Sequence, residues 1–598
     1  MKIEEGFKQP EQPTEHPFVQ DPVLPALVQR LFPDEQKSEV GRALANLGDH
    51  LVADVRPLTP LVHAPVLVQY DAWGRRVDEL RASEGWKLLK QRAIAAGHMK
   101  EAYSRDSGEY SRIRMFMKLM MSAGDYNVVL CPFAMTDGAA RVIELYGSPE
   151  MKRVLFPCLI SDDPERAYLS GQWMTERPGG SDVSQTETVA IPTSRVSSDL
   201  GEPYILNGFK WFSSAAEGHM TIALARTGDS ALGARSLSAF VIPLRTADFP
   251  SPLSNGIRMH RLKNKSGTHG LPTAELELNG TRGWLIGPLN GGIKTISTML
   301  NITRVYSAIT SVGALQRALS IARSYATVRT IYSPGIPGAK DALLKDLPIH
   351  TATLAKISLL YRALAHLTFG VVQLLGKNEA GTATAGEMGR LRLLTPVIKA
   401  WAADKCPEAM MECMCALGGQ GYMEEVGIGR LIRDAMVEKI WEGTINVLSL
   451  DLLRASKDAS AVRSYIQWAE LLLSQVPSAL DSALSDVKSS LTAYLKALPP
   501  MFDAARQDST LARPVLNFLG CLSASFYLLE HAIWSYTNNR PEKDIDVDAV
   551  RRWIMQGELP QSFSEVENSV GNGTSPDAVE KDYQLVYGMA HGKAKAML

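Results

Sequence analysis

The segment Trp441-Glu442-Gly443-Thr444 places one carboxylate among apolar and small neighbours, directly before a helical pattern over residues 445–454. Burial raises the pKa of a carboxyl group toward neutrality, where it can take a proton from carbon, and the helix start that follows tempers this rise. Glu442 is therefore a candidate general base. This segment by itself leaves a second interpretation open, an ordinary acidic residue that caps a helix. Glu438 and Glu425 are the next acids to consider for the same role.

A second segment lies far upstream and contains Met174-Thr175-Glu176-Arg177-Pro178-Gly179-Gly180-Ser181-Asp182. Together with the Trp-Glu-Gly-Thr segment it resembles the acyl-CoA dehydrogenase superfamily, whose members carry Met/Val-Thr-Glu-x-x-x-Gly-Ser-Asp and Tyr/Trp-Glu-Gly-Thr/Ser in this order. Further segments agree in order and spacing: Asn207-Gly208-Phe209-Lys210-Trp211-Phe212-Ser213-Ser214, Arg261-Leu262-Lys263-Asn264-Lys265, Gly283-Trp284-Leu285-Ile286-Gly287, Thr303-Arg304 and Leu417-Gly418-Gly419-Gln420-Gly421-Tyr422. The Arg-Leu-Lys-x-Lys, Gly-Trp-Leu-x-Gly and Lys-Trp-Phe pieces look most like the adaptive-response, AidB-type branch. The resemblance covers roughly residues 20–456.

The resemblance implies bound FAD, held between a β-domain and a second helical domain. It assigns Met174, Thr175, Gly180 and Ser181 to the flavin ring and pyrophosphate, where small residues permit close backbone approach. The other cofactor contacts that it implies are Trp211, Ser213, Arg329, Gly418, Gly419, Trp441, Gly443 and Thr444. Trp211 would stack beside the ring and Ser213 would offer a hydroxyl near N5. A strand-core aromatic is the alternative interpretation of Trp211.

The resemblance also implies a homo-oligomer, a tetramer or a dimer, because Arg329 and the Gly418-Gly419 pair would contact the cofactor of a neighbouring subunit. Relatives have Phe-Gly where this chain has Tyr332-Ser333, and often Gln where it has Cys415. These departures predict an altered grip on the adenine half of the cofactor.

Substrate contacts are assigned by resemblance to Ser181 and Arg304. A typical member has an acid at the position of Asn301, where it holds the pantetheine arm, so coenzyme A binding is left open. The chemistry implied is α,β-dehydrogenation of an acyl thioester or a related activated acid, with Glu442 as base and flavin N5 as hydride acceptor. The reduced flavin would pass electrons to an electron-transfer flavoprotein or to oxygen. The alternatives are a flavin oxidase that uses oxygen and an alkylation-response flavoprotein that binds DNA.

Composition bounds the remaining function classes. The net charge is −1, from 63 basic and 64 acidic residues, and residues 457–598 hold 13 basic and 17 acidic residues. A basic footprint for nucleic acid is therefore missing, and nucleic-acid binding is not expected. There is no GxGxxG after a strand, no P-loop and no HExxH, so neither a Rossmann site nor a metal site is predicted. The acidic N-terminus and the six dispersed cysteines favour a cytoplasmic location, without a mitochondrial, secretory or peroxisomal signal. The most apolar window, residues 354–375, contains Lys356, Arg362 and His366 and is expected to be a buried helix and not a membrane span.

The patterns along the chain predict a mainly α, α+β fold in four parts. Residues 1–164 form an extended arm and a helical domain, 165–287 a central β-domain, 288–456 a helical bundle with the catalytic base, and 457–598 a C-terminal helical extension. The order helices, β, helices is that of the acyl-CoA dehydrogenase fold.

Overall fold

The computed structural model describes residues 3–194, 199–247, 251–331, 342–572 and 576–589. The chain forms two compact units. The first contains residues 1–382 and 402–444, and the second contains residues 383–401 and 445–598. Helix α12 (Ala385–Ala416) contributes to both units. Tyr332-Ser333 lie outside the described residues.

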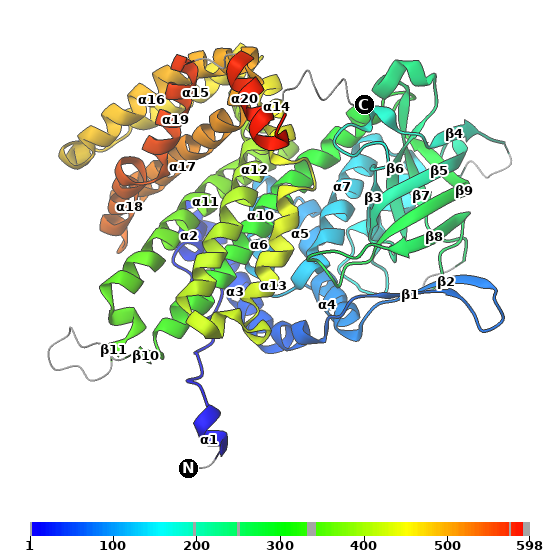
Figure 1. The fold of residues 1–598 in the computed structure, drawn as a ribbon, viewed down its shortest axis with the longest axis horizontal. Coiled ribbons are helices and arrows are strands. Elements are labelled where there is room, and N and C mark those ends of the chain that lie inside the picture. Colours follow the sequence, from blue (N-terminus) through cyan, green and yellow to red (C-terminus); the bar gives the residue numbers. More distant parts are fainter. Residues whose placement is uncertain (1–2, 195–198, 248–250, 332–341, 573–575, 590–598) are drawn as a thin grey trace. The chain divides into compact units, whose positions relative to one another are not determined.

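The β-domain of the first unit is a seven-stranded sheet whose pairing closes on itself (Figure 1). Its strands are β3 (Ser170–Trp173), β4 (Val189–Pro192), β5 (Pro203–Ser214), β6 (Met220–Arg226), β7 (Leu237–Pro243), β8 (Ile257–Leu262) and β9 (Thr273–Ile286). The ring runs β4–β5–β9–β7–β6 and returns to β4, while β3 pairs with β6 and β8 pairs with β9. Apolar side chains such as Trp173, Leu206, Phe240 and Met259 fill the interior and hold the ring together.

A β-hairpin interrupts the N-terminal region, which the sequence pattern predicted to be helical throughout. Strands β1 (Val66–Tyr70) and β2 (Arg76–Arg81) pair across a turn that contains Gly74 in a left-handed conformation. The hairpin lies against β8, since Asp78 accepts the backbone N–H of Met259 at 3.0 Å. The β-branched run followed by a glycine turn is the signal that identifies such a hairpin.

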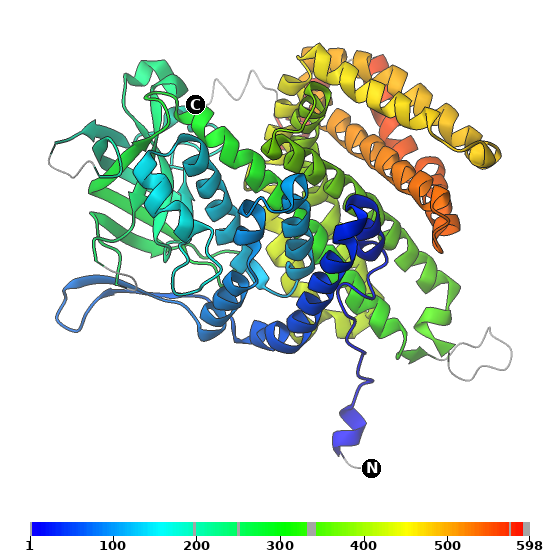
Figure 2. The same cartoon turned by 180° about the vertical axis from the view of Figure 1, so that it is seen from behind.

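The helices of the first unit are α1 (Ile3–Phe7), α2 (Leu24–Leu31), α3 (Asp34–His50), α4 (Glu84–Ala95), α5 (His98–Tyr103), α6 (Ser111–Ser122), α7 (Leu130–Tyr146), α8 (Pro149–Val154), α9 (Phe156–Leu159), α10 (Gly292–Ala326), α11 (Pro348–Ala380) and α13 (Ile428–Ala435). Helices α6, α7 and α11 pack around α10, and Figure 2 shows the same arrangement from behind. A buried ion network joins three of them: Arg112 of α6 contacts Asp137 of α7 at 2.6 Å and Glu379 of α11 at 2.8 Å. The predicted arm is extended only in part, because α1 is helical.

The second unit consists of the first half of α12 and of α14 (Ile445–Ala455), α15 (Ala459–Ser474), α16 (Asp481–Gln507), α17 (Ala512–Thr537), α18 (Lys543–Gln556), α19 (Glu558–Asn572) and α20 (Pro576–Tyr587). Trp401 of α12 meets Trp553 of α18 edge to face, with ring centroids 5.9 Å apart. Gly520 of α17 packs on the Trp401 ring so closely that a Cβ there would lie 2.8 Å from it. The first half of α12 and the C-terminal extension therefore share one core within the second unit.

Two of the described helical segments, Pro348–Ala380 and Ser509–Thr537, are long and apolar enough to cross a membrane by length and composition alone. In their most apolar windows 72% and 83% of the residues are buried inside the protein. Buried core helices show the same property.

Candidate active site around Glu442

Helix α10 presents three hydroxyl side chains at a spacing of four and then three residues, so that they share one face of the helix. Thr303 donates to the Oε2 atom of Glu442 at 2.5 Å. One turn later Ser307 donates to Glu438, at 2.5 Å, and Thr310 donates to the same carboxylate at 2.8 Å. A single helix face thus binds both acids of the segment that precedes α14.

The half-buried Glu442 lies in a turn between the 3-10 helix η10 (Met436–Lys439) and α14. Its φ of 57° is in the left-handed region, which a residue with a β-carbon rarely adopts, and Gly443 follows with a φ of 102°. Arg304 supports the turn, because its Nε donates to the backbone carbonyl of Glu442 at 3.4 Å. Held strain of this kind is common where a protein positions a functional side chain.

The predicted flavin segment forms a tight loop after β3. Glu176 and Gly179 exchange two backbone hydrogen bonds of 3.2 Å, and the N–H of Trp211 in β5 donates to the carbonyl of Thr175 at 3.0 Å. Met174 is buried and Thr175 is half-buried, whereas Gly180 and Ser181 are exposed. The loop and β5 therefore bring Thr175 and Trp211 together, with Met174 directly before Thr175.

A buried ion pair fixes this loop to the barrel. The Nζ of Lys210 lies 2.6 Å from Oε1 of Glu176 and donates to the carbonyl of Leu224 at 2.8 Å. Burial by itself would raise the pKa of Glu176, but the charge and hydrogen bond of Lys210 and the N–H groups of residues 187 and 188 hold it below its ordinary value. The acid of the Met-Thr-Glu motif is thus structural here.

Two features of the β-domain fit a flavin. The Oγ of Ser213 is buried and has no hydrogen-bond partner among the described residues, so it is available to a bound group. A Cβ on Gly180 would come within 2.9 Å of the Thr175 side chain, so only glycine permits the close loop. Trp211 is half-buried, and the Nζ of Lys263 lies 3.3 Å from its ring centroid, so a cation already covers one face of the ring.

Cys131 lies at the start of α7 and is influenced by charges of both the β-domain and the Glu442 segment. Its pKa is raised chiefly by burial; the ammonium of Lys265 opposes this rise, while the carboxylates of Glu438, Glu442 and Glu217 add to it. Lys265 is itself largely buried, and this burial is the main reason that its pKa falls to about 8. Charged groups of the β-domain and of the segment before α14 therefore act on this thiol.

The loop that carries Lys265 also contacts the helices directly. The N–H of Thr268 donates to Asp434 of α13 at 2.6 Å, and Gly267 packs on the backbone carbonyl of Arg433 with no space for a side chain. Because α13 leads into η10, the β-domain loop and the turn with Glu442 are close in space. Sequence reasoning missed this role of Gly267 and Thr268, which the spacing after Arg-Leu-Lys-x-Lys does not reveal.

Three predicted cofactor residues make no contact with the residues around Glu442 in the described part of the chain. Arg329 follows the end of α10 and its Nη1 donates to Gln9 at 3.4 Å. The helix rises about 35 Å between Thr303 and its last residue, so Arg329 is far from Glu442 of its own chain. Gly418 and Gly419, in the 3-10 helix η8 (Gly418–Tyr422), are exposed, and a Cβ on either would meet no atom within 4 Å. Cys415, just before them, is exposed as well.

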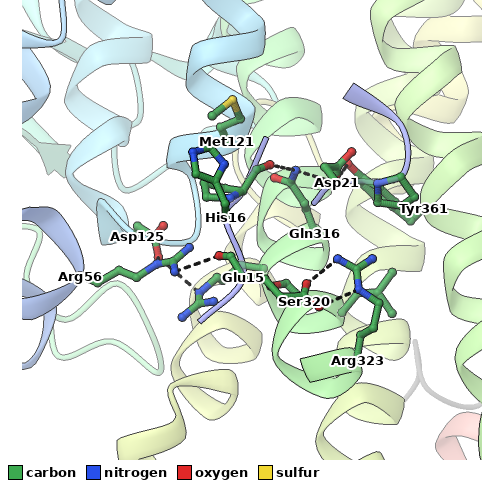
Figure 3. Close-up of a pocket in the computed structure, with 14 residues that line it drawn as sticks. Glu15, His16, Asp21, Arg56, Met121, Asp125, Gln316, Ser320, Arg323 and Tyr361 are labelled. Atoms are coloured by element: carbon green, nitrogen blue, oxygen red, sulfur yellow. Dashed lines mark hydrogen bonds and ion pairs between the residues drawn. The ribbon is translucent and has the colours of Figure 1, made fainter. Parts of the chain in front are cut away.

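Figure 3 shows a pocket that contains none of the predicted site residues. It lies where residues 15–22 cross α10, roughly 20 Å along the helix from Thr303. Its cations are already paired: Arg56 contacts Asp125 at 2.9 Å, and Arg323 contacts Glu15. The second of these ion pairs therefore holds the N-terminal segment on the helical core. Among the described residues, no group of three or more His, Cys, Asp or Glu could hold a metal ion.

Comparison with known proteins places this architecture. The family models described as "Adaptive response protein AidB N-terminal domain", "Acyl-CoA dehydrogenase, middle domain" and "Acyl-CoA dehydrogenase, C-terminal domain" match residues 8–163, 171–281 and 290–457. Acyl-CoA dehydrogenase family member 11 of Caenorhabditis elegans is 37% identical over 561 residues, which are 91% of this chain and 88% of that protein. The chain belongs to the acyl-CoA dehydrogenase family. It is accordingly an FAD-dependent oxidoreductase of the acyl-CoA dehydrogenase type.

Other relatives and solved structures support this assignment to the acyl-CoA dehydrogenase family. The putative acyl-CoA dehydrogenase AidB of Escherichia coli is 30% identical over 70% of this chain and 74% of that protein. The structure of Caenorhabditis elegans ACDH-11 in complex with C11-CoA matches with a TM-score of 0.85 and 34% identity, over 95% of this chain and 98% of that one. The apo form of Bd2924 matches with a TM-score of 0.80 and 37% identity, over 88% of this chain and all of that one. The predicted fold and its AidB-like character are confirmed.

Proposed function

We propose that the protein dehydrogenates an acyl-CoA thioester between its α and β carbons, with Glu442 as the general base. The observation that carries this proposal is the Glu442 carboxylate, held on a strained turn by Thr303 of α10. This turn follows α13, which the β-domain loop contacts through Thr268. Bound FAD would supply the acceptor for the hydride that leaves the β carbon. Glu442 would take the α proton, and the electron pair of the broken α C–H bond would form the new double bond between the α and β carbons.

Thr303 is suited to both protonation states of the base. Its hydroxyl lies 2.5 Å from Glu442 and 3.3 Å from the carbonyl of Leu300. Against a carboxylate the hydroxyl donates to Glu442, which favours the ionised form before reaction. After Glu442 has taken the proton, its own O–H would donate to Thr303, whose hydrogen would turn to Leu300. The base would therefore keep a partner throughout the reaction.

The remaining site residues are part of the same proposal. Ser213, Met174, Thr175, Gly180, Ser181 and Trp211 would hold the flavin, together with Trp441, Gly443 and Thr444 beside the base. Ser181 and Arg304 would contact the substrate. The similarity to a protein solved with C11-CoA supports an acyl-CoA substrate, although the exposed Asn301 takes the place of the usual pantetheine-binding acid.

We further propose a homo-oligomer, a tetramer or a dimer of the same pairing type. The separation between Arg329 and Glu442 supports this, because Arg329, just past the end of α10, is too far away to serve a cofactor beside Glu442 of its own chain. The exposed Gly418-Gly419 pair is free of close contacts with the described residues of its own chain and is open to another subunit. Electrons would leave to an electron-transfer flavoprotein or to oxygen. The DNA-binding alternative is not favoured. Arg551 and Arg552 are adjacent basic residues of the C-terminal extension that could have contacted phosphates, but they form ion pairs with Asp486 and Asp548.

The test is Glu442→Gln in the flavin-loaded protein. Purified protein should be yellow with about one FAD per chain, and a panel of acyl-CoA thioesters under anaerobic conditions should bleach it. The variant should keep FAD and lose flavin reduction by roughly 10²- to 10⁴-fold, the usual contribution of a general base. Glu425→Gln, at an exposed acid of the same region, is the matched control and should reduce normally. Undiminished reduction by Glu442→Gln would remove the base role from this residue.

A further inference from the structure

Glu438 is a second carboxylate beside the base, and it is buried, with 5% of its surface exposed. Its Oε2 accepts the hydroxyl of Ser307 and the indole N–H of Trp441, both at 2.5 Å, and its Oε1 accepts the hydroxyl of Thr310 at 2.8 Å. Three donors around one carboxyl group favour its ionised form and leave little freedom to receive a proton from substrate. Glu438 is thus unsuited to be the base itself.

A buried carboxylate is costly unless it has a task, and three hydrogen bonds are arranged here to keep one in place. On α10, Thr303 binds Glu442, while Ser307 and Thr310 bind Glu438. Both acids are therefore held by the same face of one helix. Trp441 directly precedes Glu442, and its indole N–H donates to Glu438. Any movement of Glu438 would be passed to the strained turn of the base.

The two carboxylates also share an electrostatic environment. Thr303 and Ser307 lie about 6 Å apart, one turn of α10, and each donates to one of the two carboxylates, so the two carboxylates lie near each other. Like charges in one poorly solvated region disfavour each other's ionisation. A charge at Glu438 would therefore increase the affinity of Glu442 for a proton.

We propose that Glu438 is a positioning residue that anchors Trp441 and, through its negative charge, sets the pH range in which Glu442 acts as a base. The inference rests on the proposed function of Glu442. Glu438 would touch neither substrate nor flavin. It would act through the indole of Trp441 and through its charge.

The other groups around Glu438 do not replace this role. On its own 3-10 helix, Lys439 is bound to Asp404 of α12 at 3.0 Å. Cys406 of α12 is buried, and burial first and Glu438 second raise the pKa of its thiol, so it stays neutral. On α13, Arg430 lies 3.6 Å from Asp434. Further out on that helix, Arg433 is paired with Glu424.

On α10, Arg304 contacts the backbone carbonyl of Glu442. Around Cys131 lie Lys265 and Glu217, which have opposite charges. The test therefore has to change Glu438 alone and to follow the base through its pH dependence.

The experiment measures flavin reduction by an acyl-CoA thioester against pH in the FAD-loaded protein. The base acts when ionised, so reduction increases with pH through an acid limb. Glu438→Gln removes the neighbouring negative charge and should move the midpoint of this limb to lower pH by roughly one unit, with about tenfold slower reduction on the plateau and little change in KM. Thr303→Val removes a donor to the base and should move the midpoint in the opposite direction.

A Trp441→Phe variant separates the two parts of the role. It removes the indole N–H and keeps the charge of Glu438, so reduction should slow by severalfold while the midpoint stays in place. FAD content and circular dichroism check that each variant is folded. If Glu438→Gln does not fold, Ser307→Ala and Thr310→Val loosen the same carboxylate one donor at a time, and each should slow reduction.

A Glu438→Gln protein with the parent rate and the parent midpoint would overturn the inference, as would slower reduction with the midpoint unmoved. Failure of the proposed function is distinguishable, because it would appear as normal reduction by Glu442→Gln. An inactive Glu442→Gln together with a normal Glu438→Gln would reject only the role of Glu438.

Discussion

Replacing Lys210 by methionine should loosen the flavin segment, because this change leaves Glu176 buried without its counter-ion. The side chain of Lys210 is 1% exposed, and its Nζ lies 2.6 Å from Glu176 and 2.8 Å from the carbonyl of Leu224. Methionine keeps the length and the apolar stem of lysine but neither the charge nor the donors. The substitution therefore isolates the ion pair that fixes the Met174–Ser181 loop to the barrel.

Breaking a buried ion pair by removing one partner costs about 3 to 5 kcal/mol. Glu176 keeps the N–H of Glu187 at 2.6 Å and of Thr188 at 3.2 Å, so we expect the lower end of this range. A loss of about 3 kcal/mol corresponds to roughly 150-fold faster amide exchange in segments that open locally. The double variant Glu176→Gln with Lys210→Met removes the stranded charge and should recover at least half of that loss.

Hydrogen exchange of peptides covering the loop and β5 measures these changes, and FAD content after gel filtration shows their effect on the cofactor. The matched control is Arg258→Met, which removes a surface ion pair with Glu277 at 3.8 Å and 55% exposure of the arginine side chain. That change should cost less than about 1 kcal/mol. Parent-like protection and parent-like FAD content in Lys210→Met would refute the reasoning.

The remaining predictions concern acid stability and the C-terminal extension. The pKa of His219 is lowered to about 4, first by burial and then by the charges of Arg245 and Lys90, while its Nδ1 accepts the N–H of Leu169. Neutral His219 therefore contributes stability that is complete above about pH 6.5 and is lost as the pH falls toward 4, by roughly 3 kcal/mol. His219→Asn keeps an acceptor and should flatten the decline in melting temperature over this window; an unchanged decline would contradict the assignment. Truncation after Ser456 uncovers the Trp401 side of α12 and should cause aggregation or loss of assembly, which light scattering measures. If the parent protein instead binds duplex DNA in a salt-sensitive way and this truncation abolishes the binding, the DNA-binding alternative would be supported.

The sequence by itself determined the family and the order of helices, β-domain and helices. Local signals suffice for this, because periodicity marks long elements such as α10 and α11, and glycine-rich motifs mark turns that few residues can form. It also proposed Glu442 as the base, because its neighbours along the chain are small and apolar. The missed hairpin β1–β2 is a short element inside a helical region, where a local pattern competes with its surroundings.

Only the tertiary structure decided what surrounds these residues. Thr303, Ser307 and Thr310 are ordinary polar residues of a helix in the sequence, and they become partners of Glu442 and Glu438 only because α10 packs beside η10. The pairing of Lys210 with Glu176 joins residues 34 positions apart, and the approach of Gly267 to α13 spans more than 160. Hydrogen bonds and charges depend on distance in space, which periodicity along the chain does not encode, so the partners of each acid could not be predicted from the sequence.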